Sequence, residues 1–131
     1  MNKNTILAWS SAFGLIAVIL GALGAHALKA QLEPSSLASF TTGVRYQAWH
    51  AIGLLAIAMG SFNLKYLKGI VWCWIIGTFC FSGSIYLLST AAVSGLQVSF
   101  LGPVTPVGGL FFMAGWLLVF LSAMNVAKRK S

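Results

Sequence analysis

Acidic residues are almost absent from this chain: its 131 residues include no aspartate and a single glutamate, Glu33. Charged residues of both signs make up 7% of the sequence, whereas a water-soluble domain has about a quarter. Catalysis by a pair of carboxylates needs two acids whose pKa values differ, so the composition excludes it. The same shortage of charge argues against a water-soluble globular domain.

Other residue types that support chemistry are also scarce. The two histidines, His26 and His50, make a poor zinc site, because zinc generally takes three or four protein ligands. Cys73 and Cys80 lie on one predicted helix, so we expect no intrachain disulfide and interpret both as apolar packing side chains. A pairing of Ser84 with His50 would lack the carboxylate that orients the imidazole in a catalytic triad. We therefore expect no enzymatic activity, no metal and no cofactor.

Hydrophobic residues make up 59% of the chain and are gathered in four long runs. A helix needs about 20 mainly apolar residues to cross the hydrocarbon core of a bilayer. Backbone polar groups find no water there, so an open-ended run crosses as a helix, and these runs lack the alternation of β-barrel strands. The sequence predicts one all-α integral membrane domain over residues 1–131. Its four transmembrane helices are expected at about 5–26, 44–62, 69–92 and 106–127.

The first outer loop is predicted to contain a further helical segment. Glu33 and Pro34 indicate a turn, after which Ser35 or Ser36 is expected to be the N-cap. Apolar residues then recur at near-helical spacing: Leu37, Phe40 and Val44. This pattern is typical of an interfacial helix that lies on the outer membrane surface. The chain would then enter the bilayer at Arg45 or Tyr46.

The last helix has its own start signal. Thr105 is predicted to be the N-cap, with Pro106 at the first helical position, where a missing N–H does no harm. The preceding loop, from Val93 to Thr105, carries no charge.

Basic residues predict the orientation of the chain. Six fall on the side of the two termini: Lys3, Lys65, Lys68, Lys128, Arg129 and Lys130. Lys29 and Arg45 fall on the other side. Since Lys and Arg are retained in the cytoplasm, we expect a multi-pass protein of a bacterial cytoplasmic membrane with both termini inside. The 128–130 tail is expected to attract anionic lipid headgroups. Nucleic acid is not an expected partner, because the charges lie at helix ends and form no stripe with exposed aromatics.

Small residues form a seam on the first helix: Gly14, Ala17, Gly21 and Ala25, with Gly24 beside them. Small residues three or four positions apart let two helices approach closely in a membrane. The seam is interpreted as packing within the bundle, while contact in a homo-oligomer or in a larger membrane complex stays open. The tryptophans are interpreted as lying mostly near helix ends, where aromatic belts form: Trp9, Trp49, Trp72, Trp74 and Trp116.

Polar residues at membrane depth are the candidate site, because they are costly there and are often functional. The set, expected toward the outer ends of the helices, is His26, Arg45, Tyr46, Gln47, His50, Ser82, Ser84 and Tyr86. Structural roles are open alternatives. His26 and His50 could hydrogen-bond across two helices, and Arg45 could anchor to lipid phosphate. Serines inside lipid can bond back to the preceding turn.

Four ordered motifs run through nearly the whole chain: GALGAHAL at 21–28, FTTGVRYQAWHA at 40–51, FSGSIY at 81–86 and LGPVTPVGG at 101–109, followed by Gly115 and Trp116. In these motifs the chain resembles the domain-of-unknown-function 423 family of small bacterial inner-membrane proteins, whose eukaryotic relatives include transmembrane protein 256. The resemblance implies a four-helix integral membrane protein without an established activity. Its motif residues coincide with most of the polar set, which favours one hydrogen-bonded cluster.

Three functional hypotheses follow. The first is a non-enzymatic packing or assembly partner of a membrane complex. The second is an outer-leaflet pocket for a lipid or quinone-like headgroup, formed by His26, Arg45, Tyr46, Gln47 and His50, in which the arginine would contact phosphate. The third is a small-solute or proton pathway, which would require an oligomer because four helices seldom enclose a pore.

Overall fold

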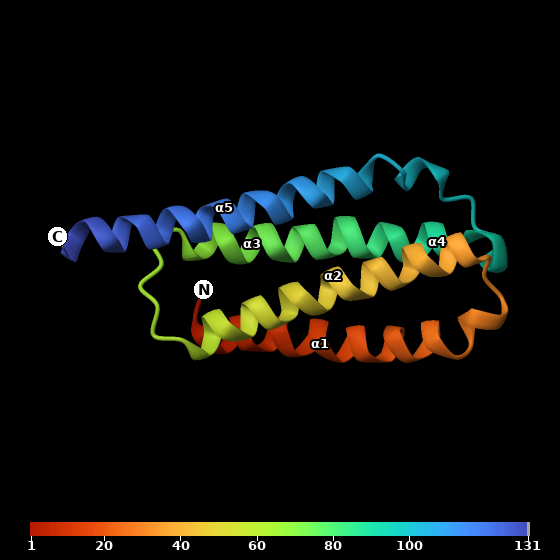
Figure 1. Ribbon diagram of the computed structural model, residues 1–131, viewed down its shortest axis with the longest axis horizontal. Coiled ribbons are helices and arrows are strands. Elements are labelled where there is room, and N and C mark those ends of the chain that lie inside the picture. The colour runs from red at the N-terminus through yellow and green to blue at the C-terminus, as the bar shows by residue number, and fades with distance from the viewer. Residues whose placement is uncertain (131) are drawn as a thin grey trace.

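The computed structural model describes the backbone of residues 1–130 and the side chains of residues 1–125, so the side chains of the basic 128–130 tail lie outside the described residues. The regular structure of 1–130 is helical throughout (Figure 1). The long elements are α1 (Lys3–Ala25), α2 (Pro34–Met59), α3 (Leu67–Gly77), the π-helical turn η2 (Thr78–Gly83), α4 (Ser84–Ser94) and α5 (Val104–Lys130). Two short 3₁₀ turns, η1 (Leu28–Ala30) and η3 (Ser99–Leu101), lie in the connections.

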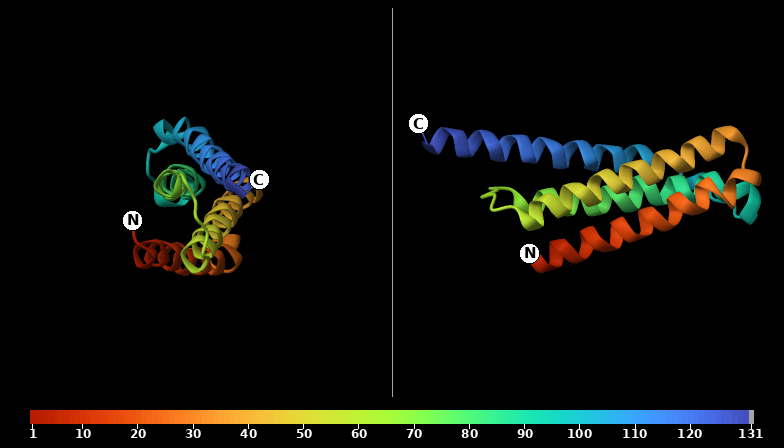
Figure 2. Two further views of the ribbon diagram at one scale, coloured as in Figure 1. Left: turned by 90° about the vertical axis from the view of Figure 1, so that its left-hand side faces the viewer. Right: turned by 60° about the horizontal axis from the view of Figure 1, so that its bottom comes forward.

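The long elements form antiparallel rods, and α3, η2 and α4 follow one another as a single rod (Figure 1). Both ends of the chain lie at the same end of the bundle. α2 packs between α1 and the η2–α4 part of the long rod, and α5 packs against α3 and η2, as the two further views also show (Figure 2). This all-helical arrangement agrees with the predicted class.

Local sequence explains several helix ends. Asn2 caps α1, since its side-chain oxygen accepts a hydrogen bond from the backbone N–H of Thr5 at 2.8 Å. Gly95 ends α4 in the left-handed conformation, with φ 71°, which glycine adopts without the steric cost of a side chain. At the end that holds the termini, Lys3 Nζ donates to the carbonyl of Gly60 at 2.9 Å and ties α1 to the end of α2.

The predicted start of the second helix is wrong. α2 begins at Pro34 after an N-cap at Glu33, so Ser35 and Ser36 lie inside the first turn. The helix then runs without a break to Met59, so a separate interfacial segment before Arg45 is not confirmed. Proline is well suited to the first position because its fixed φ is already helical, and no helix breaker follows it.

The predicted cap of the last helix is also wrong, since α5 begins at Val104. Thr105 therefore lies in the first turn, where its hydroxyl meets Ser84 rather than a backbone amide.

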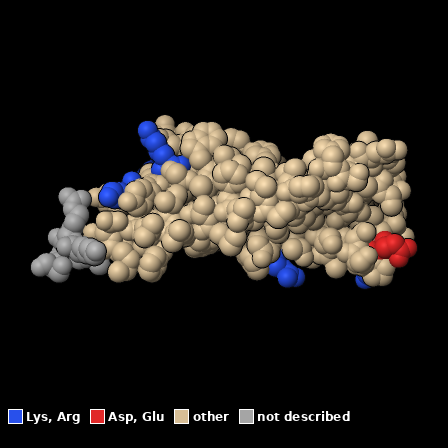
Figure 3. Space-filling model, turned by 90° about the horizontal axis from the view of Figure 1, so that it is seen from above, with Lys and Arg blue, Asp and Glu red and all other residues tan. Residues whose placement is uncertain are grey.

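Three helical segments are long and apolar enough to cross a membrane: Lys3–Ala30, Leu67–Ser94 and Ser99–Asn125. α2 is not among them, and its outer half carries hydroxyl side chains and Arg45. Seen from above, the surface between the two ends of the molecule is almost free of charge, apart from a basic group at its edge (Figure 3).

The core is built around Trp74, which is 2% exposed. Its ring fits against two glycines, because a Cβ on Gly53 would lie 2.7 Å from the ring and one on Gly115 would lie 2.3 Å from Nε1. Trp74 therefore does not belong to an interfacial belt; it joins α2 to α5 through α3. Its indole nitrogen is buried and has no hydrogen-bond partner among the described residues.

The π-helical turn η2 brings hydroxyl groups against the backbone. Thr78 Oγ1 donates to the Trp74 carbonyl at 2.8 Å, and Ser84 Oγ to the Phe81 carbonyl at 3.0 Å. In lipid, such bonds satisfy carbonyls that a change of helical pitch would leave without partners. The turn also directs Ser82, which is fully buried, toward α2. π-helical turns are frequent at functional sites.

Candidate functional site

The predicted polar residues of α2 lie in the middle of that helix and not at its outer end. His50 follows Pro34 by about 24 Å along the helix axis, at about 1.5 Å per residue. His26 is the exposed C-cap of α1, at the outer end of the bundle. The predicted hydrogen bond between the two histidines is therefore absent. The misplaced start of α2 caused this error, because it put His50 one turn below the membrane surface.

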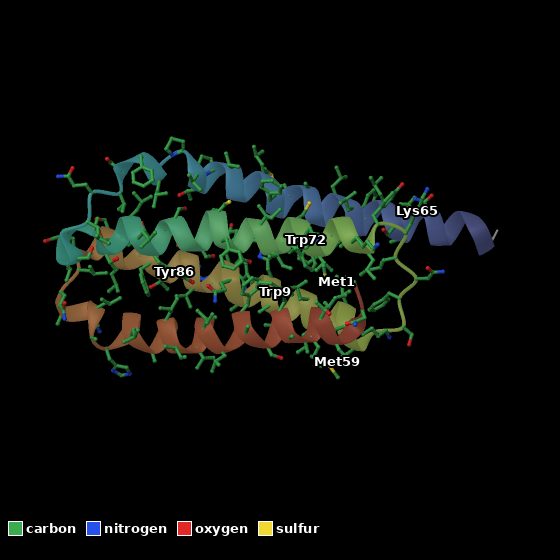
Figure 4. The ribbon with its side chains drawn as sticks, turned by 180° about the vertical axis from the view of Figure 1, so that it is seen from behind. Met1, Trp9, Met59, Lys65, Trp72 and Tyr86 are labelled. Carbon is green, nitrogen blue, oxygen red and sulfur yellow. The ribbon has the colours of Figure 1, made fainter. Side chains whose placement is uncertain are left out.

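Gln47 connects three helices. Its Nε2 donates to the carbonyl of Phe13 in α1 at 2.8 Å, and its Oε1 accepts from the hydroxyl of Tyr86 in α4 at 2.9 Å. The residue is 3% exposed. Tyr86 reaches from α4 toward α1 and α2, and Trp9 of α1 points toward the α3–α4 rod (Figure 4).

A glycine lets Tyr86 and Ser82 approach α2. A Cβ on Gly43 would lie 2.9 Å from Cε1 of Tyr86. The carbonyl of Gly43 accepts a hydrogen bond from Ser82 Oγ at 2.8 Å. Phe40 packs on the same tyrosine ring, with centroids 5.0 Å apart. The first polar group of the site is therefore Gln47, Tyr86 and, beside them, Ser82.

His50 forms the second polar group with the two residues that bond its ring. Its Nδ1 lies 2.7 Å from the backbone carbonyl of Tyr46, which can only accept, so Nδ1 carries the proton. Its Nε2 lies 3.2 Å from the indole nitrogen of Trp116, which can only donate. The imidazole is therefore neutral with both nitrogens in hydrogen bonds. Its ring stacks on Phe112 with centroids 3.6 Å apart and planes 8° apart.

Ser84 belongs to a third group, because its Oγ lies 2.6 Å from Oγ1 of Thr105 and also donates to the carbonyl of Cys80. The eight candidate residues thus do not form one hydrogen-bonded cluster. Six of them fall into three groups, while His26 and Arg45 are exposed and take part in none. Among the described side chains, no three of the types His, Cys, Asp and Glu lie close enough together to hold a metal ion.

A cleft of about 430 Å³ opens between α2, η2 and α5 beside His50. Its lining is aromatic apart from one glycine and one methionine: Tyr46, Trp49, His50, Phe81, Gly109, Phe112, Met113 and Trp116. Sequence reasoning found only Tyr46 and His50, because the tryptophans were assigned to membrane belts. The pair Gly108–Gly109 opposite the FSGSIY motif was the available signal, since small residues permit a close helix approach there.

These features define a helical integral membrane protein in which most of the predicted polar residues bond groups on neighbouring helices or turns. The chain belongs to the family described as "Protein of unknown function (DUF423)", whose model matches residues 20–109. It is 36% identical over 114 residues to the UPF0382 membrane protein YwdK of Bacillus subtilis, a match that covers 85% of this chain and 89% of the relative. It is 35% identical over 133 residues to the UPF0382 inner membrane protein YgdD of Escherichia coli K12, a match that covers 99% of this chain and 96% of the relative. No solved structure matches the chain.

Proposed function

We propose that this protein is a non-enzymatic assembly partner that binds another membrane protein through the exposed face of α2. In this proposal all four rods span the bacterial cytoplasmic membrane, and both termini lie in the cytoplasm. The basic residues at the end that holds the termini support this orientation. One observation carries the proposed function: Arg45 is exposed at the depth of the apolar middle of α1.

Two contacts on either side of Arg45 define its depth. Val44 packs on Gly21, with 3.5 Å between its Cγ1 and the position of a Cβ, and Gln47 bonds the Phe13 carbonyl. Arg45 therefore lies level with residues 13–21 of α1. The exposed large side chains of that stretch are all aliphatic: Leu15, Ile16, Val18 and Ile19. A guanidinium that faces acyl chains at this depth costs at least about 2.5 kcal/mol.

The face of α2 around Arg45 is also polar. Thr41, one turn before Arg45, is exposed on the outer half of the helix, whereas Trp49, Ile52 and Met59 are exposed on its inner half. A partner that covers the outer half would remove the arginine from lipid and would let α2 remain inserted between α1 and α4. This is consistent with α2 being the one long rod that is not apolar enough to span by itself.

A second copy of this chain cannot supply a carboxylate that pairs with Arg45. Glu33 is the single acidic residue, and it lies about 18 Å from Arg45 along the axis of α2. Two copies in the same orientation would face arginine with arginine. The partner that fits is a transmembrane segment of a different protein with an aspartate or glutamate at the depth of Arg45. A hydrogen-bonded ion pair of this kind is strong away from water.

Charge exchange tests this proposal in native membranes. The tagged full-length chain would be purified in mild detergent as wild type, Arg45→Leu, Arg45→Lys and, as the matched control, Lys29→Leu. We expect a stoichiometric membrane partner with wild type and Lys29→Leu, less of it with Arg45→Lys, and none with Arg45→Leu. Arg45→Glu should recover binding only when the partner's acidic residue is changed to lysine.

A different outcome of the same purification would contradict the assembly function. A wild-type protein that is purified without a membrane partner, and an Arg45→Leu variant with the same insertion and the same thermal stability, would make Arg45 a lipid anchor. The assembly function would then be withdrawn.

The aromatic cleft favours a second candidate, the binding of a planar ring such as a quinone headgroup. Ligand pockets typically measure about 300–1,000 Å³ and combine apolar walls with few polar groups, and this cleft holds about 430 Å³. Tyr46 lines it and can donate its hydroxyl to a ligand carbonyl, while the nitrogens of His50 already have partners. The site would lie mid-membrane and would not include His26 or Arg45, unlike the outer-leaflet pocket expected from the sequence.

Quenching of tryptophan fluorescence tests whether a quinone binds in the cleft, because Trp49 and Trp116 line it. We expect a short-chain ubiquinone to quench wild type saturably and to bind Tyr46→Phe several-fold more weakly. Tyr66→Phe is the control, because Tyr66 does not line the cleft. This variant should bind the quinone as tightly as wild type. Quenching that does not saturate, or that is equal in all three proteins, would contradict the candidate.

A further inference from the structure

A second cavity, of about 450 Å³, lies at the outer end of the bundle and shares no lining residue with the aromatic cleft. Three helices contribute its lining, which consists of six hydroxyl residues and two aliphatic ones: Ser35, Ser36, Ser39, Thr42, Ile85, Leu88, Ser89 and Thr105. No charged side chain lines it. We propose that this cavity binds the phosphate group of an outer-leaflet lipid.

Ser89 supports the binding of a hydrogen-bond acceptor in this cavity, which its side chain helps to line. The residue is 5% exposed, and its hydroxyl has no hydrogen-bond partner among the described residues. The other serines and threonines of 67–94 all donate to a backbone carbonyl: Thr78, Ser82, Ser84, Thr90 and Ser94. A serine inside a helix ordinarily bonds back to the preceding turn. Ser89 instead presents its hydroxyl to the cavity, where it is free to donate to an oxygen of a ligand.

Two helices begin at the cavity. Ser35 and Ser36 belong to the first turn of α2, which starts at Pro34, and Thr105 belongs to the first turn of α5, which starts at Val104. First-turn amides lack carbonyl partners within their own helix, and the positive ends of both helix dipoles favour an anion. The ligand chemistry is therefore that of an anion with several acceptor oxygens, and a cationic headgroup would be disfavoured.

The position of the cavity identifies the source of the phosphate. It lies where α2 and α5 begin, at the end of the bundle opposite to the chain termini (Figure 1). Ile85 and Leu88 extend its wall along α4 toward the bilayer interior, where the glycerol and the first acyl carbons of a lipid would follow the phosphate. Glu33 is exposed and is not part of the lining. Hydroxyl groups and amides therefore provide the contacts.

The test uses delipidated full-length protein in mild detergent. Thermal unfolding and native mass spectrometry would be followed while phosphatidylglycerol, diacylglycerol or inorganic phosphate is added. Ser89→Ala removes the unpaired hydroxyl. Thr90→Val is the matched control, because it removes the neighbouring hydroxyl, which already bonds the Tyr86 carbonyl at 2.8 Å and does not line the cavity.

We expect phosphatidylglycerol to raise the unfolding temperature of wild type and of Thr90→Val alike. Ser89→Ala should bind it about tenfold more weakly, the loss of one hydrogen bond to a charged group. Without lipid, Ser89→Ala should unfold at about the same temperature as wild type, because the substitution removes no hydrogen bond within the described residues. Diacylglycerol should give no shift.

Three results would overturn the proposal. Equal affinities of wild type and Ser89→Ala would remove the site. Diacylglycerol binding as tightly as phosphatidylglycerol would show that the phosphate is not recognised. Inorganic phosphate that stabilises the protein as strongly as the lipid, with the same loss in Ser89→Ala, would identify a free anion rather than a lipid as the ligand.

Discussion

Two glycine-bearing interfaces hold this bundle together, and they differ in how closely the backbones approach. Where α5 meets η2, a Cβ on Gly108 would lie 2.3 Å from the backbone nitrogen of Phe81. Where α1 meets α2, a Cβ on Gly24 would lie 3.2 Å from the ring of Phe40, and one on Gly14 would have no neighbour within 4 Å. Glycine is therefore required by a backbone contact at Gly108, whereas Gly14 has room for a methyl group.

The α1–α2 interface is reinforced by hydrogen bonds between its two helices. Ser10 Oγ donates to the Ala51 carbonyl at 2.9 Å, and Gln47 Nε2 donates to the Phe13 carbonyl. In a membrane, helices associate through dispersion at close contact or through hydrogen bonds between them. Both interfaces include hydrogen bonds, since α5 also bonds α2 through Trp116 and α4 through Thr105. The contact of α5 with η2 adds a backbone-to-backbone approach at Gly108.

The largest effect should come from Gly108→Ala. The new methyl group would meet backbone atoms, which cannot move aside as a flexible side chain can, so we expect a loss of about 3 kcal/mol in the free energy of unfolding. Denaturation in mixed detergent micelles measures it. Gly109→Ala is the matched control, because its Cβ would lie 3.8 Å from the Phe81 ring, an ordinary contact. Equal stability of the two variants would contradict a backbone-to-backbone contact.

Gln47→Leu should come next, since it removes the bonds to Phe13 and Tyr86 from a buried position. We expect about 1–2 kcal/mol of destabilisation, because interhelical hydrogen bonds in membranes average about 0.6 kcal/mol and leaving buried partners unpaired adds to this. A double-mutant cycle with Tyr86→Phe measures the coupling. Additive effects of the two changes would argue against the bond.

Ser10→Ala should have a smaller effect, about 0.6 kcal/mol, the average for one interhelical hydrogen bond in a membrane. The neighbouring Ser11 is exposed, so Ser11→Ala serves as the control and should leave the same unfolding curve unchanged. If the two alanine variants behave alike, the α1–α2 interface does not depend on the Ser10 bond.

The smallest effect should be that of Gly14→Ala, a gain of about 0.5 kcal/mol from the better helix propensity of alanine. The site has open space for the methyl group. A marked loss of stability or of a native complex would show that Gly14 contacts another protein in the membrane. Gly14 would then belong with the glycines that close packing requires.

Particular residues show how far the sequence predicted the fold. The bounds of α1 and of the α3–α4 rod were predicted within a few residues, because long apolar runs leave helix as the only open-ended solution in lipid. The start of α2 was missed by ten residues, whereas α5 begins two residues before its predicted start. Ser35, Ser36 and Thr105 are residue types that often cap helices, but α2 and α5 begin before them, so capping preference alone placed these starts too late.

The candidate site was predicted in part, for a related reason. Gln47 and Tyr86 do bond each other, as the expected cluster required, but the bonds of His50 to Trp116 and of Ser82 to Gly43 connect residues far apart in the sequence. Such pairs depend on how two helices cross, which helical spacing alone does not specify. The depth of Arg45 was missed with the start of α2.

The sequence by itself determined that this chain is an apolar helical protein of a membrane, because composition and run length decide whether a backbone can leave water. It also identified the family. Only the tertiary structure decided which glycines are in backbone contact, which polar groups satisfy one another, and which hydroxyl remains unpaired. Those outcomes depend on the register and crossing of packed helices, where a shift of one residue turns a side chain about 100° around the axis and exchanges its neighbours.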